Sequence, residues 1–170
     1  MARYFYLLTA FDRRTDADKF IFWMQKKPFT LTSGSGFSCH VQSWVSKGNL
    51  TWVSCEPQGV SLGTRTTADW LVRDAGQLDE VAGLLYRSLF DAGDFCCALA
   101  GWEAADLFLP PPESGYADLR LDPVKWASPG WDGLVLSDAH WRTAGKPEAF
   151  LPFCDGYLWQ PYRTLSGSGW

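Results

Sequence analysis

Five cysteines and two histidines carry the most specific chemistry in this chain of 170 residues. A cysteine nucleophile needs a histidine within hydrogen-bond reach. Cys39 and His40 are adjacent, but consecutive strand residues point to opposite faces, so we expect no such pair in the strand predicted there. The tertiary fold could bring His140 close to Cys96 or Cys154, but their spacing in the sequence does not indicate such a contact. The odd number of cysteines and the lack of C-x-x-C spacing indicate reduced thiols, most of them buried.

Metal binding would involve Asp138 and His140, because an i, i+2 spacing in an extended chain projects two ligands together. Asp132 or Asp155 could add a third ligand. The chain has only two histidines and no second cluster of ligand residues, so a hydrogen-bonded turn at Asp138 is the simpler interpretation. We therefore predict no metal and no other cofactor.

Two carboxylates suggest a possible hydrolase. Glu103 and Asp106 follow an expected buried strand, where a pair of acids could perform acid–base catalysis. The abundance of aromatic residues, with 10 Trp, 6 Tyr and 11 Phe, would also suit stacking against sugars. Acidic residues end strands in many folds, so this small hydrolase remains an alternative. The Gly/Ser segment 33–36 lacks the spacing of a phosphate-binding loop.

Charge and hydropathy argue against nucleic acid and membrane partners. Residues 1–30 hold six basic and three acidic residues, but their aromatic residues fall at expected core positions and the whole chain carries a net charge of −4. No run approaches the roughly 18 apolar residues that a membrane-spanning helix needs. The N-terminus does not resemble a secretory leader, so we expect a cytoplasmic protein.

Hydrophobic periodicity predicts the main elements. A buried strand is expected over residues 3–11, and a helix should begin at Thr15 or Asp16 and end before Pro28. The strongest hairpin pattern covers 37–55. Further along the chain we expect a short strand at 59–65, a helix at 75–91, a strand buried on both faces at 95–102 and a strand at 133–137.

This order of elements predicts the fold class. Strands and helices in this sequence indicate a single α+β domain over residues 1–165, with a mostly antiparallel sheet and two main helices packed on one face. The C-terminal residues 166–170 are expected to fray. Elsewhere after residue 110, Pro, Gly, Asp and Trp alternate too often for long elements.

The second half of the chain is acidic and rich in tryptophan. Residues 91–138 contain nine acids against Arg120 and Lys125, a net charge of −7. Acids speed encounters with basic partners, and large aromatic residues often dominate interface energies. We therefore predict an acidic, aromatic partner-binding surface. Its expected members are Trp102, Glu103, Asp106, Glu113, Tyr116, Asp118, Trp126, Trp131, Asp132 and Trp141.

The expected helix at 78–90 leads into a buried strand that ends in Gly101-Trp102-Glu103. This pattern resembles the stand-alone immunity proteins of bacterial polymorphic and secretion-system toxins. The resemblance implies a non-enzymatic role, in which the protein binds and neutralises one cognate toxin with a basic surface. These families share no catalytic motif, so the resemblance assigns no functional residue. An adaptor protein is the third hypothesis, beside the immunity protein and the hydrolase.

Overall fold

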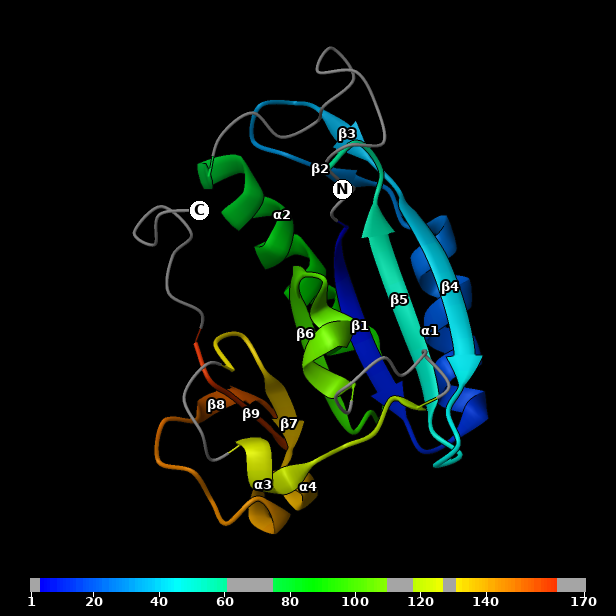
Figure 1. Cartoon of the computed structure of the whole chain (residues 1–170). Coiled ribbons are helices and arrows are strands. Elements are labelled where there is room, and N and C mark those ends of the chain that lie inside the picture. The colour runs from blue at the N-terminus through cyan, green and yellow to red at the C-terminus, as the bar shows by residue number, and fades with distance from the viewer. Residues whose placement is uncertain (1–3, 61–74, 110–117, 127–130, 162–170) are drawn as a thin grey trace.

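The central strand β1 (Phe5–Phe11) organises the fold, and all seven of its residues are buried. A computed structural model describes residues 4–60, 75–109, 118–126 and 131–161. β1 pairs with β5 (Thr51–Pro57) on one side and with β6 (Cys97–Trp102) on the other, both antiparallel. The seven-stranded sheet has the order β4-β5-β1-β6-β7-β9-β8, and every neighbouring pair is antiparallel (Figure 1).

The remaining elements are short apart from β4 and two helices. The strands are β2 (Phe29–Thr30), β3 (Gly36–Phe37), β4 (Cys39–Val45), β7 (Val135–Ser137), β8 (Leu151–Cys154) and β9 (Tyr157–Trp159). The α-helices are α1 (Arg14–Lys26), α2 (Ala75–Ser88), α3 (Pro123–Trp126) and α4 (Asp138–Thr143). Two 3-10 helices, η2 (Leu89–Asp91) and η3 (Ala104–Phe108), flank β6. No helix in the described ranges is long and apolar enough to cross a membrane.

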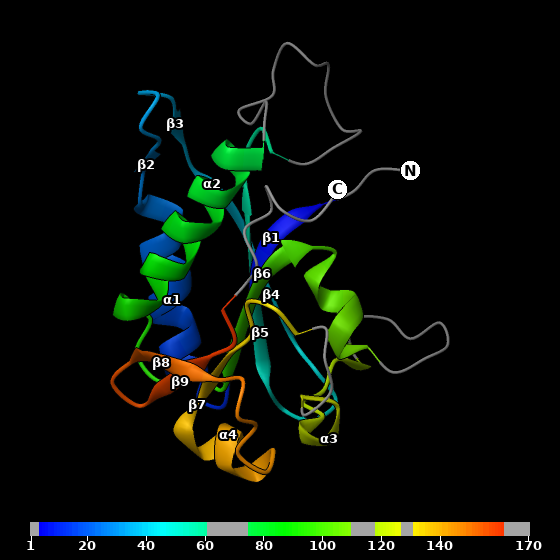
Figure 2. The ribbon, with the colours of Figure 1, turned by 90° about the vertical axis from the view of Figure 1, so that its left-hand side faces the viewer.

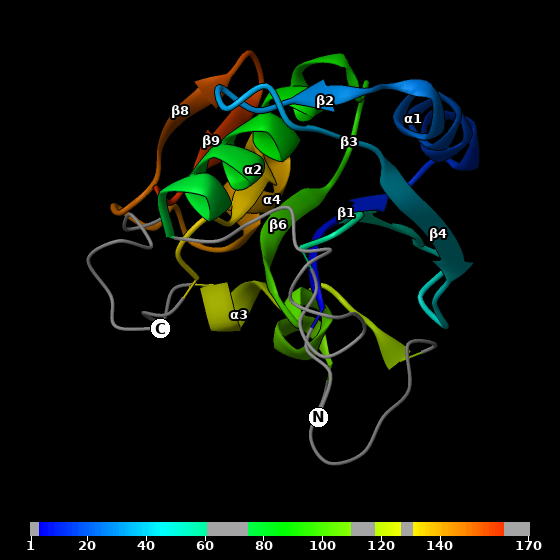
Figure 3. The same ribbon diagram turned by 90° about the horizontal axis from the view of Figure 1, so that it is seen from above.

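The first half of the chain follows a β-α-β-β-α-β path. The elements β1, α1, β4, β5, α2 and β6 occur in this order, and their strands lie in the sheet as β4-β5-β1-β6. This is the arrangement of the split β-α-β motif. The two-stranded sheet of β2 and β3 lies between α1 and α2 when the molecule is seen from above (Figure 3). Its loop is tied to α2, because Thr32 Oγ1 donates to Glu80 Oε2 at 3.0 Å.

Both main helices cover the same face of the sheet, as the sequence predicts (Figure 2). Ala17, Phe20 and Met24 follow one another at i+3 and i+4 spacing, which places them on one stripe of α1, where all three are buried. Leu85 of α2 belongs to the same core cluster, together with Leu7 and Phe11 of β1. This face is therefore closed by two amphipathic helices.

The opposite face of the sheet is covered by the second half of the chain. We call residues 104–109, 118–126, 131–134 and 138–150 the cap. Leu8 of β1 and Trp52 of β5 point to this face and share a core cluster with residues of the cap. The ring of Phe108 lies 5.1 Å from that of Trp52 and 5.5 Å from that of Trp131. The cap therefore buries the second side of β1.

One tyrosine joins the helix layer to the strands. The hydroxyl of Tyr86 on α2 accepts a hydrogen bond from Ala100 N at 3.0 Å and donates to Gly133 O at 2.8 Å. Gly133 has φ +89°, and a Cβ at this position would lie 2.4 Å from the Tyr86 oxygen. Glycine is therefore required at 133 both by backbone conformation and by space.

The structure confirms the predicted fold class and corrects several details. α1 begins at Arg14 with Arg13 as its N-cap residue, so Thr15 and Asp16 lie in the first turn. The chain turns at Gly59 and Val60, and the rest of the predicted strand at 59–65 lies outside the described residues, as does the tail at 166–170. The β8–β9 hairpin was not predicted, because its strands are too short for a periodic pattern.

We predict that replacing Tyr86 by Phe lowers the free energy of unfolding by about 1–3 kcal/mol, because a buried N–H and a buried C=O both lose a partner. Urea titration followed by circular dichroism measures this change. Tyr4→Phe is the matched control, since Tyr4 is 40% exposed and should change stability little. Equal effects of the two substitutions would contradict the linking role of Tyr86.

Candidate functional site

A cleft of about 390 Å³ lies at one edge of the sheet and is the best candidate site. Asp12 follows β1, Asp94 precedes β6, Asp138 follows β7 and Asp155 precedes β9. Because adjacent strands are antiparallel, these four strand ends meet at the same edge. The remaining lining residues are Arg13, Phe95, Ser137, Ala139, His140, Gly156 and Tyr157. We call this feature the acidic cleft.

Backbone hydrogen bonds hold the four loops of the acidic cleft together. Cys96 N donates to Ala10 O at 2.7 Å, and Ser137 N donates to Cys96 O at 3.0 Å. Asp138 N in turn donates to Gly156 O at 2.7 Å. These bonds continue the sheet ladder to its last residues, so the carboxylates are positioned by rigid strands rather than by long loops.

The acidic cleft holds four carboxylates against one guanidinium in its lining. Arg13 pairs with Asp94 at 2.9 Å and also with Asp16 at 2.6 Å. Asp138 pairs with Arg142, which lies outside the lining, at 2.7 Å. Within the described ranges, Asp12 and Asp155 make no ion pair. The cleft therefore keeps a negative charge that favours cationic ligands.

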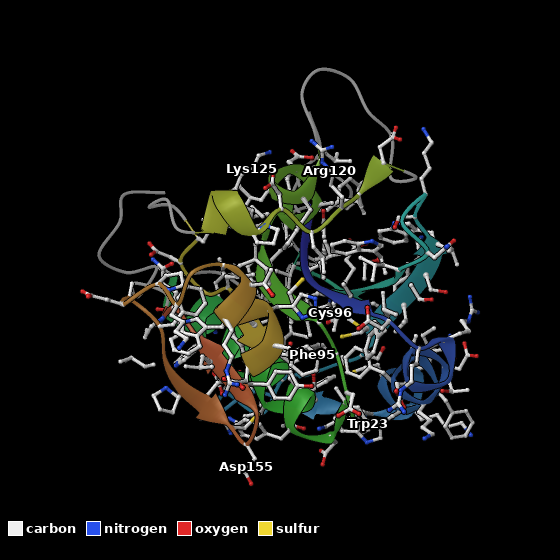
Figure 4. All side chains as sticks on the ribbon, turned by 90° about the horizontal axis from the view of Figure 1, so that it is seen from below. Trp23, Phe95, Cys96, Arg120, Lys125 and Asp155 are labelled. Carbon is white, nitrogen blue, oxygen red and sulfur yellow. The ribbon has the colours of Figure 1, made fainter. Side chains whose placement is uncertain are left out.

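The basic residues of the acidic segment lie away from the cleft. Seen from below, Phe95 and Cys96 lie near the centre of the molecule and Asp155 at the tip of the β8–β9 turn (Figure 4). Arg120 and Lys125 lie on the opposite side of this view, near α3. Neither residue lines the cleft. Arg120 and Lys125 therefore contribute their charge to another part of the surface, whereas Arg142 of the cap pairs with Asp138 of the cleft.

Two stacked aromatic rings form one wall of the acidic cleft. The ring centroids of Phe95 and Tyr157 lie 4.1 Å apart with an interplanar angle of 16°. Phe95 N donates to the Tyr157 hydroxyl at 2.9 Å, and this hydroxyl donates to Gly93 O at 3.4 Å. Burial raises the pKa of Tyr157, so its phenol stays protonated. The wall is thus apolar and uncharged beside the carboxylates.

His140 lies in the first turn of α4, at the margin of the acidic cleft, and contacts the residue that caps this helix. Ser137 Oγ accepts from His140 N at 3.4 Å, which makes Ser137 the N-cap of α4, and Oγ also lies 2.7 Å from His140 Nδ1. Burial lowers the pKa of His140 below its usual value of 6.5, although the charge of Asp12 opposes this effect. At neutral pH the imidazole is therefore uncharged. The Ser137–His140 contact stabilises the N-terminus of α4.

The structure corrects the expected geometry of the metal candidates. Asp138 and His140 lie in helix α4 rather than in an extended chain, so their i, i+2 spacing does not project both side chains the same way. Asp138 is engaged by Arg142. No group of three or more His, Cys, Asp or Glu side chains in the described ranges could hold a metal ion. Asp132 is instead bonded by the Gln160 amide at 3.2 Å.

The cysteines are free thiols, and none is activated. Cys39 is buried and His40 exposed, so the two point apart as predicted. Burial raises the pKa of all five thiols. At Cys96 this effect is reinforced by a hydrogen bond with Asp12. A protonated thiol is a poor nucleophile, so the raised pKa of Cys96 does not favour catalysis by a Cys96–His140 pair.

Three tryptophans of the predicted partner-binding surface are buried or half-buried in the structure. Trp131 is only 6% exposed and packs in the core, with its indole N–H donating to Lys125 O, so it is not part of a surface. Trp102 is half-buried with its ring 5.4 Å from that of Phe5. Trp141 is half-buried and its indole N–H donates to Pro147 O. These three tryptophans therefore contribute mainly to packing.

The acids of the predicted surface lie on separate elements. Glu103 is half-buried, and its Oε1 accepts a hydrogen bond from Tyr4 N at 2.8 Å. Asp106 is exposed on η3, and Asp118 pairs with Lys47 of the β4–β5 turn at 2.5 Å. Glu113, Tyr116 and the side chain of Trp126 lie outside the described residues. None of the described members of this set lines the acidic cleft.

Sequence reasoning missed the acidic cleft because its carboxylates are far apart in the chain. None of the four aspartates was among the predicted partner-binding residues. Asp94 and Asp138 were counted in the charge of residues 91–138, and Asp138 and Asp155 were considered as metal ligands. The available clue was that each aspartate lies within three residues of a strand end. Only the strand order brings those ends together.

Comparisons with protein families, with curated proteins and with solved structures found no match to this chain. The functional proposal below therefore depends on the chemistry of the site.

We predict that His140 makes stability depend on pH. Because the pKa of His140 is lower in the folded state, the unfolded chain binds more protons below pH 6.5. The free energy of unfolding should thus fall as the pH drops through 6.5, and it should fall less in His140→Gln. Urea titrations over this range measure both slopes. His40→Gln is the control, and a steeper loss in His140→Gln than in wild type would contradict the account.

We predict that one thiol reacts with iodoacetamide before the others. Cys154 is half-buried, whereas the other four cysteines are buried. Mass spectrometry of the native protein should find a single early adduct, and Cys154→Ser should remove it. Urea should make all the remaining thiols reactive. A fast adduct that persists in Cys154→Ser would show that one of the buried thiols is accessible.

Proposed function

We propose that this protein is a non-enzymatic binding protein that captures a basic protein partner through the acidic cleft. The observation that carries the proposal is the convergence of Asp12, Asp94, Asp138 and Asp155 around one cleft, with a single arginine among the described residues that line it. Clefts lined by one sign of charge concentrate the electric field and speed association with ligands of the opposite sign.

The chemistry of the acidic cleft suits lysine or arginine side chains. Asp12 and Asp155 are exposed carboxylates from two different loops, so they can accept hydrogen bonds from a guanidinium or an ammonium group. The stacked rings of Phe95 and Tyr157 offer an apolar wall for the aliphatic part of such a side chain. A partner that presents several cations would engage more than one of the four loops.

The immunity-protein class is the form of this function that we favour. The resemblance around residues 78–103 implies neutralisation of a cognate toxin, and a basic catalytic surface on that toxin would match the charge of the acidic cleft. The hydrolase alternative has less support, because Glu103 holds the start of β1 through Tyr4 N and lies outside the cleft. A general adaptor role would use the same charge with several partners.

The experiment uses the product of the gene next to the one that encodes this chain. We expect that product to stop growth when it is expressed alone, and co-expression of this protein to restore growth. Purified together, the two should form a stoichiometric complex. A neighbouring product that has no effect on growth and does not bind this chain would contradict the immunity assignment.

Paired substitutions locate the binding site on the surface. Asp12→Asn with Asp155→Asn should lower the association rate by about tenfold or more at low ionic strength, with a smaller effect in salt. Asp106→Asn with Asp132→Asn removes the same charge outside the acidic cleft and is the matched control. Surface plasmon resonance measures both rates. Equal effects of the two pairs would indicate a general charge effect and contradict a role for the cleft.

A further inference from the structure

A second cavity of about 230 Å³ lies at the other end of β1. Tyr4 lines this cavity and Asp12 lines the acidic cleft, so the two features are roughly 25 Å apart along an extended strand. The cavity is lined by Tyr4, Tyr6, His40, Gln42, Trp44, Ser54 and Glu56. We call it the sheet-face pocket, because β4, β5 and the start of β1 supply all of these residues.

Strand alternation and register build the sheet-face pocket. On β4, Cys39 points into the helix-covered core, so its neighbour His40 points to the opposite face. His40 lies opposite Glu56, and Gln42 lies opposite Ser54, in the β4–β5 ladder. Directly opposed residues of neighbouring strands share a face. The pocket therefore presents two cross-strand pairs of polar side chains on a rigid sheet.

The cap leaves this part of the sheet face open. Further along the strands, Trp52 is completely buried beneath the cap, whereas Ser54 and Glu56 on the same face of β5 are half-buried. The cap approaches the pocket at Ala105, whose N–H donates to the Tyr6 hydroxyl at 2.8 Å. That hydrogen bond fixes the ring of Tyr6 at the inner wall. Tyr4, 40% exposed, lies at the outer wall.

The lining combines aromatic rings with groups that both donate and accept hydrogen bonds. The amide of Gln42 and the hydroxyl of Ser54 can each do both, Glu56 accepts when ionised, and His40 has one donor and one acceptor when neutral. Gln42 Nε2 lies 2.8 Å from His40 Nε2, so the two side chains hold each other in position. The rings of the wall belong to Tyr4, Tyr6 and Trp44.

We propose that the sheet-face pocket binds a single neutral sugar ring. Each hydroxyl of a sugar donates and accepts, which matches the mixed polar groups of Gln42, Ser54 and Glu56. The C–H surface of the ring can pack against an aromatic side chain such as Trp44. Ligand sites of this kind combine apolar walls with a few oriented polar groups.

Charged ligands fit the sheet-face pocket less well. Among the described residues, the lining contains no lysine or arginine, and Glu56 would repel a phosphate or a carboxylate. A cation would be attracted by Glu56, but it would also face the donor groups of Gln42 and Ser54. A neutral ligand with several hydroxyl groups can donate to Glu56 and also accept from Gln42 and Ser54.

The test is an NMR titration of the ¹⁵N-labelled full chain with methyl glycosides of glucose, galactose, mannose and N-acetylglucosamine. We expect at least one glycoside to shift the Gln42 side-chain amide and the Trp44 indole N–H in a saturable way. Gln42→Ala should weaken this binding by about fivefold or more, since it removes hydrogen bonds to the ligand. Gln25→Ala, on the exposed surface of α1 across the sheet, is the matched control and should bind as wild type does.

Three results would overturn the proposal. The first is that no glycoside of the panel shifts these two signals. The second is equal binding by wild type and a folded Gln42→Ala variant. The third is that Nα-acetyl-lysine methylamide, which keeps its ε-ammonium group, shifts both signals in the same titration while the glycosides do not. That result would assign the sheet-face pocket to a cation.

Discussion

Burial of β1 on both faces is the constraint on which this fold depends. Leu7 and Phe11 face the helices, while Leu8 faces the cap, and all three are fully buried. A strand with no polar face cannot border water on either side, so the chain must supply two covering layers. The first layer, of α1 and α2, follows from the split β-α-β path. The second layer is supplied by the cap, from the second half of the chain.

The cap changes the interpretation of the aromatic residues after position 100. In the sequence their proximity to acids suggested a binding surface, but Trp131 and Phe108 are buried and pack toward Trp52. Their first role is therefore to cover the sheet. The negative charge of the acidic cleft is concentrated where strand ends meet, as at Asp12 and Asp155, because antiparallel pairing brings those ends to one edge.

Much of the fold could be predicted from the sequence, but little of the site. The hairpin at 37–55, α1 and α2 carry long periodic patterns, and the structure confirms them. Short elements such as α4 and β8 have too few residues for a pattern, so the helix that contains Asp138 and His140 was not predicted. The acidic cleft joins residues more than 140 positions apart, and such neighbours depend on strand order, which local patterns do not encode.

Native-state hydrogen exchange tests most directly whether the cap and the central strand form one cooperative unit. If the cap is needed to bury β1, the amides of Leu7 and Leu8 in β1 and of Leu134 in the cap should exchange through the same opening, with the same free energy and the same dependence on denaturant. The N–H of Leu134 donates to Trp131 O at 2.9 Å, and Tyr86 links the helix layer to Gly133 of the cap, so the opening should be global. Exchange of Leu134 at a much lower free energy, with β1 still protected, would contradict the account.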